Sequence, residues 1–189
     1  MNHLKDISGT LYFIALIPGW ELREKVRAVK ERMKADFKSG HALKSPAHIT
    51  LQMPFKRNST GELAISDTLE QFAAREASFT VDLDGFGCFA PRVIFIRITN
   101  PEPVIALHRR LKKVLLEELD FPGSEIMKTV QPHITVATRD LTREAFAEAW
   151  PGFQDEEFKG SFNANSLFLL KHNGRDWDIL KEFPFKSNG

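Results

Sequence analysis

Apolar and polar positions follow a regular order along the chain, in which strand-like stretches alternate with helix-like ones. Leu11 to Ile17 is an unbroken apolar run that ends at Pro18 and Gly19, which predicts a buried strand. Apolar residues three and four positions apart amid charge then predict an amphipathic helix over residues 21–37, ending near Gly40. Three more elements complete this half: a strand over 48–55, a helix over 62–75, and a strand over 79–89 with a bend or bulge at its Asp and Gly residues.

The second half of the chain repeats this order. The pattern predicts strands over 93–99 and 133–139, helices over 101–119 and 142–150, one or two strands within 158–170, and a last strand over 177–185. We interpret the repetition as an internal duplication, with repeats at approximately 10–90 and 92–185. Because no Pro-, Ser- or Gly-rich linker separates them, we expect residues 1–189 to form one bilobal domain. The predicted class is α+β, with two pseudo-symmetric lobes, each an antiparallel sheet backed by helices, and a central cleft.

One short motif occurs in both halves. PAHIT at residues 46–50 returns as QPHIT at residues 131–135, and each copy opens a predicted strand. With six histidines and ten threonines in 189 residues, chance would give about 0.3 His-x-Thr triplets when matches to the template are counted. Two copies at equivalent places of a repeat therefore indicate a shared function.

Side chains alternate across a strand, so His48 and Thr50 point to one face and Ile49 to the other. The first motif strand is expected to bury Ile49, Leu51, Met53 and Phe55, and to present His48, Thr50, Gln52, Pro54 and Lys56 on the opposite face. The second is expected to bury Ile134 and Val136, and to present His133, Thr135, Ala137 and Arg139. Each strand thus offers an imidazole, a hydroxyl and, further along, a cation on one surface.

Two imidazoles that face each other across a cleft can divide acid–base work between them, because their ordinary pKa of about 6.5 allows both protonation states. The threonine hydroxyls can hydrogen-bond an oxygen of the ligand. This set suits in-line displacement at phosphorus, in which one histidine activates the incoming oxygen and the other protonates the departing one. The sequence leaves open which of His48 and His133 is the base.

These residues carry a resemblance to a known family. The paired HIT motifs, the first strand LYFIALIP and the closing SLFLLKHNGRDWDILKEFPF resemble the 2H phosphoesterase superfamily, which includes 2'-5' RNA ligase-like proteins and 2',3'-cyclic phosphodiesterases. The resemblance implies that His48 and His133 are the catalytic pair, that Thr50 and Thr135 bind the phosphate, and that no metal or other cofactor is needed. Many relatives carry an arginine five residues after the second histidine, where this chain has Thr138.

The function implied is a metal-independent phosphodiesterase that hydrolyses a 2',3'-cyclic phosphate or a 2'-5' phosphodiester at an RNA end, with 2'-5' RNA ligation as the reverse reaction. Lys56 and Arg139 are further candidates for phosphate binding, because both are cations on the predicted motif faces. Exposed cations at strand ends are also commonly plain solvated residues.

Charge limits the kind of ligand. Lys and Arg total 26 against 25 Asp and Glu, so there is no overall basic field for non-specific nucleic-acid binding. We therefore expect a local partner, an RNA end or a small nucleotide. We also expect a monomeric protein. The single cysteine, Cys88, indicates a reducing compartment. The start of the sequence has no signal-peptide pattern and no apolar run is long enough to span a bilayer, so we expect a cytoplasmic protein without a membrane partner.

Three alternatives stay open. The same chemistry could act on a small cyclic nucleotide or on cyclic ADP-ribose phosphate. The fold could instead serve as a non-catalytic RNA- or nucleotide-binding module, although such a module would not need both an acid and a base. The two histidines could also be structural. A metal site is disfavoured, because no carboxylate or cysteine lies at ligand spacing around either motif.

Overall fold

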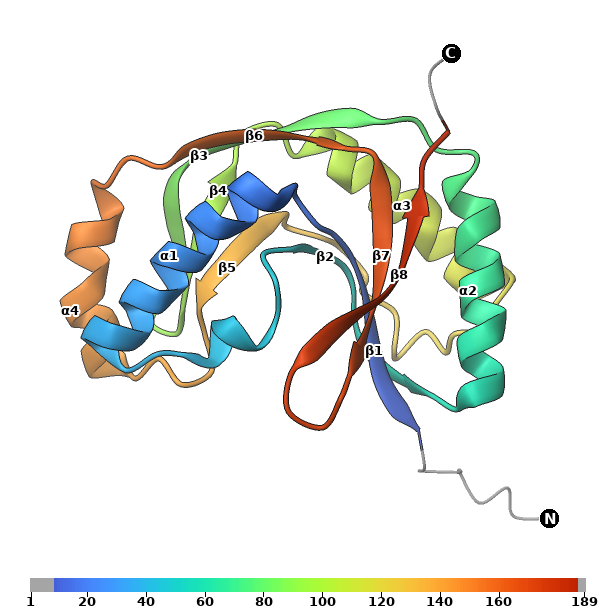
Figure 1. Cartoon of the computed structure of the whole chain (residues 1–189), viewed down its shortest axis with the longest axis horizontal. Coiled ribbons are helices and arrows are strands. Elements are labelled where there is room, and N and C mark those ends of the chain that lie inside the picture. Colours follow the sequence, from blue (N-terminus) through green and yellow to red (C-terminus); the bar gives the residue numbers. More distant parts are fainter. Residues whose placement is uncertain (1–8, 187–189) are drawn as a thin grey trace.

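The computed structural model describes residues 9–186, and the first eight residues, to which the expectation of no signal peptide applies, lie outside them. Within residues 9–186, eight strands form two antiparallel sheets of four strands (Figure 1). The first sheet has the order β2 (Ile49–Arg57), β1 (Thr10–Leu16), β7 (Ser166–His172), β8 (Trp177–Pro184). The second has the order β5 (His133–Ala137), β4 (Val93–Ile98), β3 (Phe79–Phe89), β6 (Lys159–Ala164). The predicted α+β class with two antiparallel sheets is confirmed.

In the described part of the chain, four α-helices cover the sheets, two on each. They are α1 (Trp20–Phe37), α2 (Ser59–Ala73), α3 (Glu102–Glu117) and α4 (Arg143–Gln154), with a short 3-10 helix, η1 (His41–Lys44), after α1. Helices α1 and α4 pack on the second sheet, and α2 and α3 pack on the first, at opposite sides of the molecule (Figure 1). Each sheet therefore has one covered face, and its other face is turned toward the middle of the molecule.

The two halves of the chain exchange elements between the sheets. Strand β3 follows the first motif in the sequence but pairs with β4 of the second half, whereas β7 follows the second motif and pairs with β1. Helix α1 connects two strands of the first sheet yet packs on the second, and α3 does the reverse. The two sheets thus do not coincide with the two proposed repeats, and the duplication itself stays a prediction.

Most element positions agree with the apolar periodicity, and several element ends differ from it by a few residues. Helix α1 ends at Phe37 as predicted, but the residue that ends it is Lys38 and not Gly40: Lys38 adopts the left-handed conformation (φ 59°), and its backbone N–H donates to the carbonyl of Met33. Helix α4 begins where expected, with Thr142 accepting a hydrogen bond from Ala145 N. It continues past the predicted end to Gln154, which lets Phe153 bury its ring against Phe86.

The predicted faces of β2 hold at its start and are wrong in its middle. Ile49 and Leu51 are buried as expected, but Met53 is 52% exposed and Gln52 is buried. The cause is an irregular register: Tyr12 pairs with Phe55 and Ile14 with Gln52, so β2 carries one extra residue between these pairs. A bulge of this kind reverses which residues face the core.

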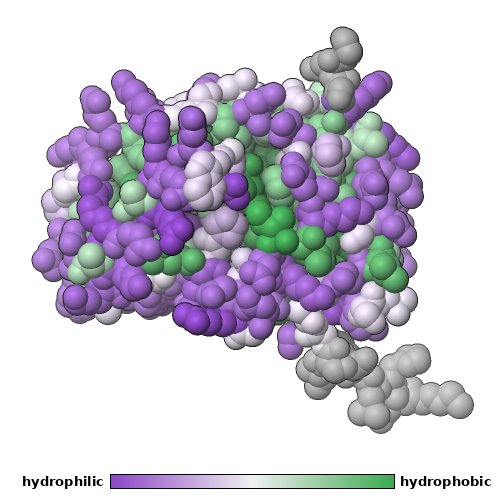
Figure 2. Space-filling view, viewed as in Figure 1, coloured by the Kyte–Doolittle hydropathy of each residue, from purple (hydrophilic) through white to green (hydrophobic). Residues whose placement is uncertain are grey.

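Apolar and polar surface are separated on the face seen in Figure 1. In the same view, apolar side chains gather in the middle of the molecule, and the flanks that carry the helices are mostly hydrophilic (Figure 2). Such a patch bordered by polar residues is typical of a ligand-binding or partner-binding surface. Among the described residues, no helix combines the length and the apolar composition that crossing a bilayer would require.

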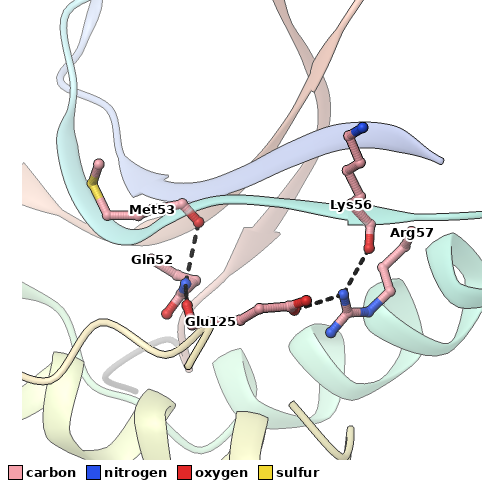
Figure 3. Close-up of polar contacts among 5 residues, drawn as sticks. All are labelled: Gln52, Met53, Lys56, Arg57 and Glu125. Atoms are coloured by element: carbon pink, nitrogen blue, oxygen red, sulfur yellow. Dashed lines mark hydrogen bonds and ion pairs between the residues drawn. The ribbon is translucent and has the colours of Figure 1, made fainter. Parts of the chain in front are cut away.

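The bulged part of β2 attaches the loop between α3 and β5. The side chain of Gln52 donates to the carbonyl of Glu125 (2.8 Å) and accepts from Met127 N (3.2 Å). Close by, Arg57 pairs with the Glu125 carboxylate at 2.9 Å (Figure 3). Buried amides are stabilising only when their polar atoms are paired. Gln52 therefore fixes the path of a loop that leads to the second motif.

This role of Gln52 gives a testable prediction. Gln52→Leu keeps the size of the buried side chain but leaves Met127 N and the Glu125 carbonyl without their partner, so the free energy of unfolding should fall by about 1–3 kcal/mol. Urea denaturation followed by circular dichroism measures the change. The matched control is Gln71→Leu on α2, where the side chain is exposed. An equal loss of stability in both variants would contradict the role of Gln52.

Candidate functional site

Both HIT motifs line one cavity of about 320 Å³. Its wall includes His48 and Thr50 from the first motif, and His133 and Thr135 from the second. The motif strands β2 and β5 are edge strands of their two sheets and lie against each other. The cavity therefore lies where the two sheets meet, and each sheet contributes one imidazole and one hydroxyl to it.

His48 is held in place by its own backbone and by an aromatic ring. It lies directly before β2 and is half-buried. Its Nδ1 lies 2.8 Å from the carbonyl oxygen of Pro46, and its ring packs against Phe13 with 4.9 Å between ring centroids. Phe13 itself is fixed, because every residue of β1 from Tyr12 to Leu16 is buried. The continuous apolar run of the sequence thus supports the first histidine.

His133 has the same surroundings in the second sheet. Its Nδ1 lies 2.6 Å from the carbonyl oxygen of Gln131, and its ring packs against Phe95 with 4.9 Å between centroids. The ring of Phe95 fits there because position 87 of β3 is glycine: a β-carbon on Gly87 would lie 2.5 Å from the Phe95 ring. The ring of Phe89 packs against His133 from another direction, with centroids 5.2 Å apart.

These contacts determine where each neutral imidazole carries its proton. A carbonyl oxygen only accepts hydrogen bonds, so Nδ1 of His48 and Nδ1 of His133 must donate. In the neutral ring this leaves Nε2 as the basic nitrogen. Burial lowers the pKa of His48 to about 4 and also lowers the pKa of His133. Both rings are therefore neutral near pH 7 without a ligand, and a bound anion would raise both pKa values.

A buried lysine acts on one histidine. Lys30 of α1 is 3% exposed, and its Nζ donates to the carbonyl of Ser45 (3.1 Å), three residues before His48. The largest cause of the lowered pKa of His48 is the burial of its ring, and the second largest is the positive charge of Lys30. The pKa of His133 is lowered by burial alone. The two histidines thus make equivalent hydrogen bonds, but only the pKa of His48 is lowered by a nearby lysine.

Three basic residues border the cavity in addition to the motif histidines: His41, Lys44 and Arg139. Strand β5 ends at Ala137, two residues before the predicted end, and Arg139 reaches the cavity through a turn in which it has a positive φ of 55°. Burial is the main cause that lowers the pKa of His41, with smaller contributions from Arg139 and Lys44. The sequence pattern does not reveal His41 and Lys44, because only the turn after α1 brings them here.

Asp140 fixes this turn. Its carboxylate accepts hydrogen bonds from Ser39 Oγ (2.9 Å), Gly40 N (2.9 Å) and His41 N (2.8 Å). The bonds join the segment after the second motif to the segment before the first one. Asp140 therefore holds His41 and its own neighbour Arg139 on the same side of the cavity.

The structure brings five of the six predicted site residues to the cavity. Lys56 is exposed and is not part of the cavity wall. Lys56 pairs with Leu11 near the far end of β2, beyond both register shifts, and therefore lies away from His48 along the strand. Among the described residues, no group of three or more His, Cys, Asp or Glu side chains is arranged to hold a metal ion.

Comparison with known proteins identifies the family. A sequence model of the 2'-5' RNA ligase superfamily matches residues 20–176, which include both motifs. The chain belongs to the 2'-5' RNA ligase superfamily. This confirms the resemblance to the 2H phosphoesterases that the two HIT motifs indicate.

A protein of Bacillus pumilus (strain SAFR-032), named provisionally as a phosphoesterase, is similar to this member of the superfamily. The two are 28% identical over 130 residues, which cover 68% of this chain and 70% of the relative.

Solved structures share the fold. A crystal structure of a phosphoesterase superposes with a TM-score of 0.69 at 21% identity, covering 95% of this chain and 100% of the other. Protein TT0787 of Thermus thermophilus gives 0.64 at 20% identity, again with 95% and 100% coverage. LigT of E. coli, complexed with 3'-AMP, gives 0.62 at 20% identity with the same coverage. At these identities the likeness concerns the fold alone.

The asymmetry created by Lys30 can be tested. Lys30→Met removes the buried charge while filling the same space, so the pKa of His48 should rise and that of His133 should change little. Titration of the imidazole signals by NMR measures both values. Lys25→Met, at an exposed position of the same helix, is the control. A pKa of His48 that stays the same or falls in Lys30→Met would exclude this influence.

Proposed function

We propose that this superfamily member is a metal-independent phosphodiesterase that hydrolyses a 2',3'-cyclic phosphate or a 2'-5' phosphodiester at an RNA end. The observation that carries the proposal is the matched pair of histidines in one cavity, each donating from Nδ1 to a carbonyl and each accompanied by a threonine. This arrangement supports two proton transfers at Nε2 atoms on a single ligand. A structural histidine has no need of a second, equivalent partner across a cavity.

In the proposed reaction, one imidazole takes a proton from water as the water oxygen bonds to phosphorus. The bond from phosphorus to one ribose oxygen breaks, and the other imidazole, in its cationic form, gives its proton to that oxygen. The acidic imidazole can be charged at neutral pH because the negative phosphodiester raises its pKa. If a 5'-hydroxyl replaces the water, the same transfers join two RNA ends through a 2'-5' bond.

Lys30 favours one division of these roles. Its charge stabilises the neutral form of His48, which is the form that a general base requires. His133, which is free of this influence, more readily holds the proton of the general acid. We therefore assign His48 as base and His133 as acid in the hydrolytic direction.

The hydroxyls and cations of the wall support binding of the phosphate. Thr50 and Thr135 alternate with core residues on their strands, so each hydroxyl faces the same side as its histidine. Arg139 and Lys44 supply positive charge at the border of the cavity. The position of Lys56 outside the wall gives no support to its predicted role, and we leave it out of the proposed site.

The volume of the cavity and the ligand bound by a protein of the same fold both bear on the nature of the ligand. The cavity is within the range of small-molecule sites, so it suits one nucleotide rather than a duplex. LigT of E. coli, which shares the fold, binds 3'-AMP in its crystal. A nucleotide with phosphate at its 3' side is therefore a suitable ligand for this cavity. The same dimensions also favour the second candidate, a small cyclic nucleotide.

The histidine assignment is tested by substitution. His48→Ala and His133→Ala should each lower kcat for a 2',3'-cyclic phosphate by about 10²–10⁴-fold, because each removes one acid–base group. Release of the 2'- or 3'-monophosphate is measured by chromatography, with a chelator present. His172→Ala is the matched control, since His172 is outside the cavity wall. Near wild-type turnover in either motif variant, or loss of wild-type activity in the chelator, would refute the mechanism.

The threonines give a separate prediction. Thr50→Val and Thr135→Val keep the shape of the side chain and remove a hydrogen bond to a charged oxygen, so kcat/KM should fall about 10- to 100-fold in each. The control is Thr80→Val on β3, which is exposed. If kcat/KM changes no more than in the control, the phosphate is held by other groups.

A further inference from the structure

A second cavity of about 340 Å³ lies beside the first. The wall of this second cavity comes from the outer side of α1 and from the segment 43–47, which precedes the first motif. The two cavities share three lining residues, Lys44, Ser45 and Trp177. A ligand longer than one nucleotide can therefore extend from one into the other along this shared border.

Two tryptophans line the second cavity. Trp20, the first residue of α1, is 65% exposed, which is unusual for such a large apolar side chain. Trp177 lies on the shared border, where its ring packs edge-on against Phe13 with centroids 4.7 Å apart. Phe13 in turn packs against His48, so the aromatic contacts continue from the first motif to the second cavity. Exposed aromatic rings of this kind are typical platforms for nucleobases.

The second cavity also carries positive charge: Arg27 pairs with Glu31 at 3.8 Å, whereas Arg23, Lys30 and Lys44 have no ion pair among residues 9–186. Its charged lining residues are Arg23, Arg27, Lys30 and Lys44, opposed by Glu24, Glu31 and Asp176. Arg23 Nε is buried and has no hydrogen-bond partner among residues 9–186, and the Arg23 guanidinium lies 5.6 Å from the centre of the Trp20 ring. Lys30 uses one hydrogen bond, to Ser45, although an ammonium can donate three. A phosphate group would satisfy these donors.

We propose that the second cavity binds the nucleotide that precedes the reacting 3' end, so that the preferred substrate is an oligoribonucleotide. This inference rests on the proposed function, since the reacting phosphate is placed between His48 and His133. The base of the preceding nucleotide stacks on Trp20, and its phosphate contacts Arg23. A mononucleotide fills only the first cavity and gains none of these contacts.

The test compares two substrates that share the reacting group. One is a trinucleotide ending in a 2',3'-cyclic phosphate, and the other is a nucleoside 2',3'-cyclic phosphate. Wild-type kcat/KM should be about tenfold higher for the trinucleotide, as expected from one stacked base. Trp20→Ala and Arg23→Gln should each remove most of this advantage without changing kcat/KM for the nucleoside substrate.

Matched controls come from exposed positions on the helices that cover the first sheet. Leu63→Ala replaces a large apolar side chain of α2 that is 67% exposed, and Arg109→Gln replaces an exposed arginine of α3. Neither should alter the ratio between the two substrates. Equal wild-type kcat/KM values for both substrates would overturn the inference. So would an equal loss for both in Trp20→Ala and Arg23→Gln.

A binding measurement separates failure of this inference from failure of the proposed function. Calorimetry compares a trinucleotide ending in a 3'-phosphate with a nucleoside 3'-phosphate, neither of which requires turnover. If the wild type cleaves neither cyclic phosphate, the proposed function fails. The inference still stands if the trinucleotide binds about tenfold more tightly and Trp20→Ala abolishes the difference. Equal affinity for the two ligands overturns it.

Discussion

The hydrogen bond from Nδ1 of each motif histidine to a carbonyl two residues earlier is the constraint on which the site depends. It holds the ring, determines its tautomer and leaves Nε2 for the ligand. The bond is only as rigid as the backbone that supplies the carbonyl. Lys30 fixes that segment before His48 by binding the Ser45 carbonyl, and Gln52 fixes the loop that leads to His133. Buried polar side chains outside the wall of the first cavity therefore also act on its chemistry through the main chain.

The exchange of elements between the sheets explains why the site lies between them. Each motif is on an edge strand, and the elements that cross from one half of the chain to the other hold the two edges together. One apolar cluster includes buried residues from both sheets and all four helices. Neither half can form its sheet alone, because each sheet contains strands from both halves. The cavity is thus a product of the complete fold, and its two histidines keep their relative positions through the common core.

Near-symmetry and local asymmetry have different roles in this molecule. Each histidine makes an equivalent hydrogen bond to a carbonyl and packs against a phenylalanine of its own sheet. This equivalence suits a reaction in which one proton is removed and another is supplied. What surrounds them differs. Lys30 and the second cavity lie on the side of His48, whereas Arg139 and its turn belong to the side of His133. These differences give the cavity a direction along which an asymmetric ligand can lie.

The sequence by itself determined the order of strands and helices, the burial of Ile49 and Ile134, and the shared face of each histidine with its threonine. These features follow from alternation within single strands, which depends only on neighbouring residues. Tertiary structure decided the rest. The pairing of β2 with β1 created the bulge that exposes Met53, and the turn held by Asp140 brought in His41. The second cavity exists because α1 crosses to the other sheet. Contacts between residues far apart in the chain determine all of these features, and such contacts cannot be predicted from a local sequence pattern.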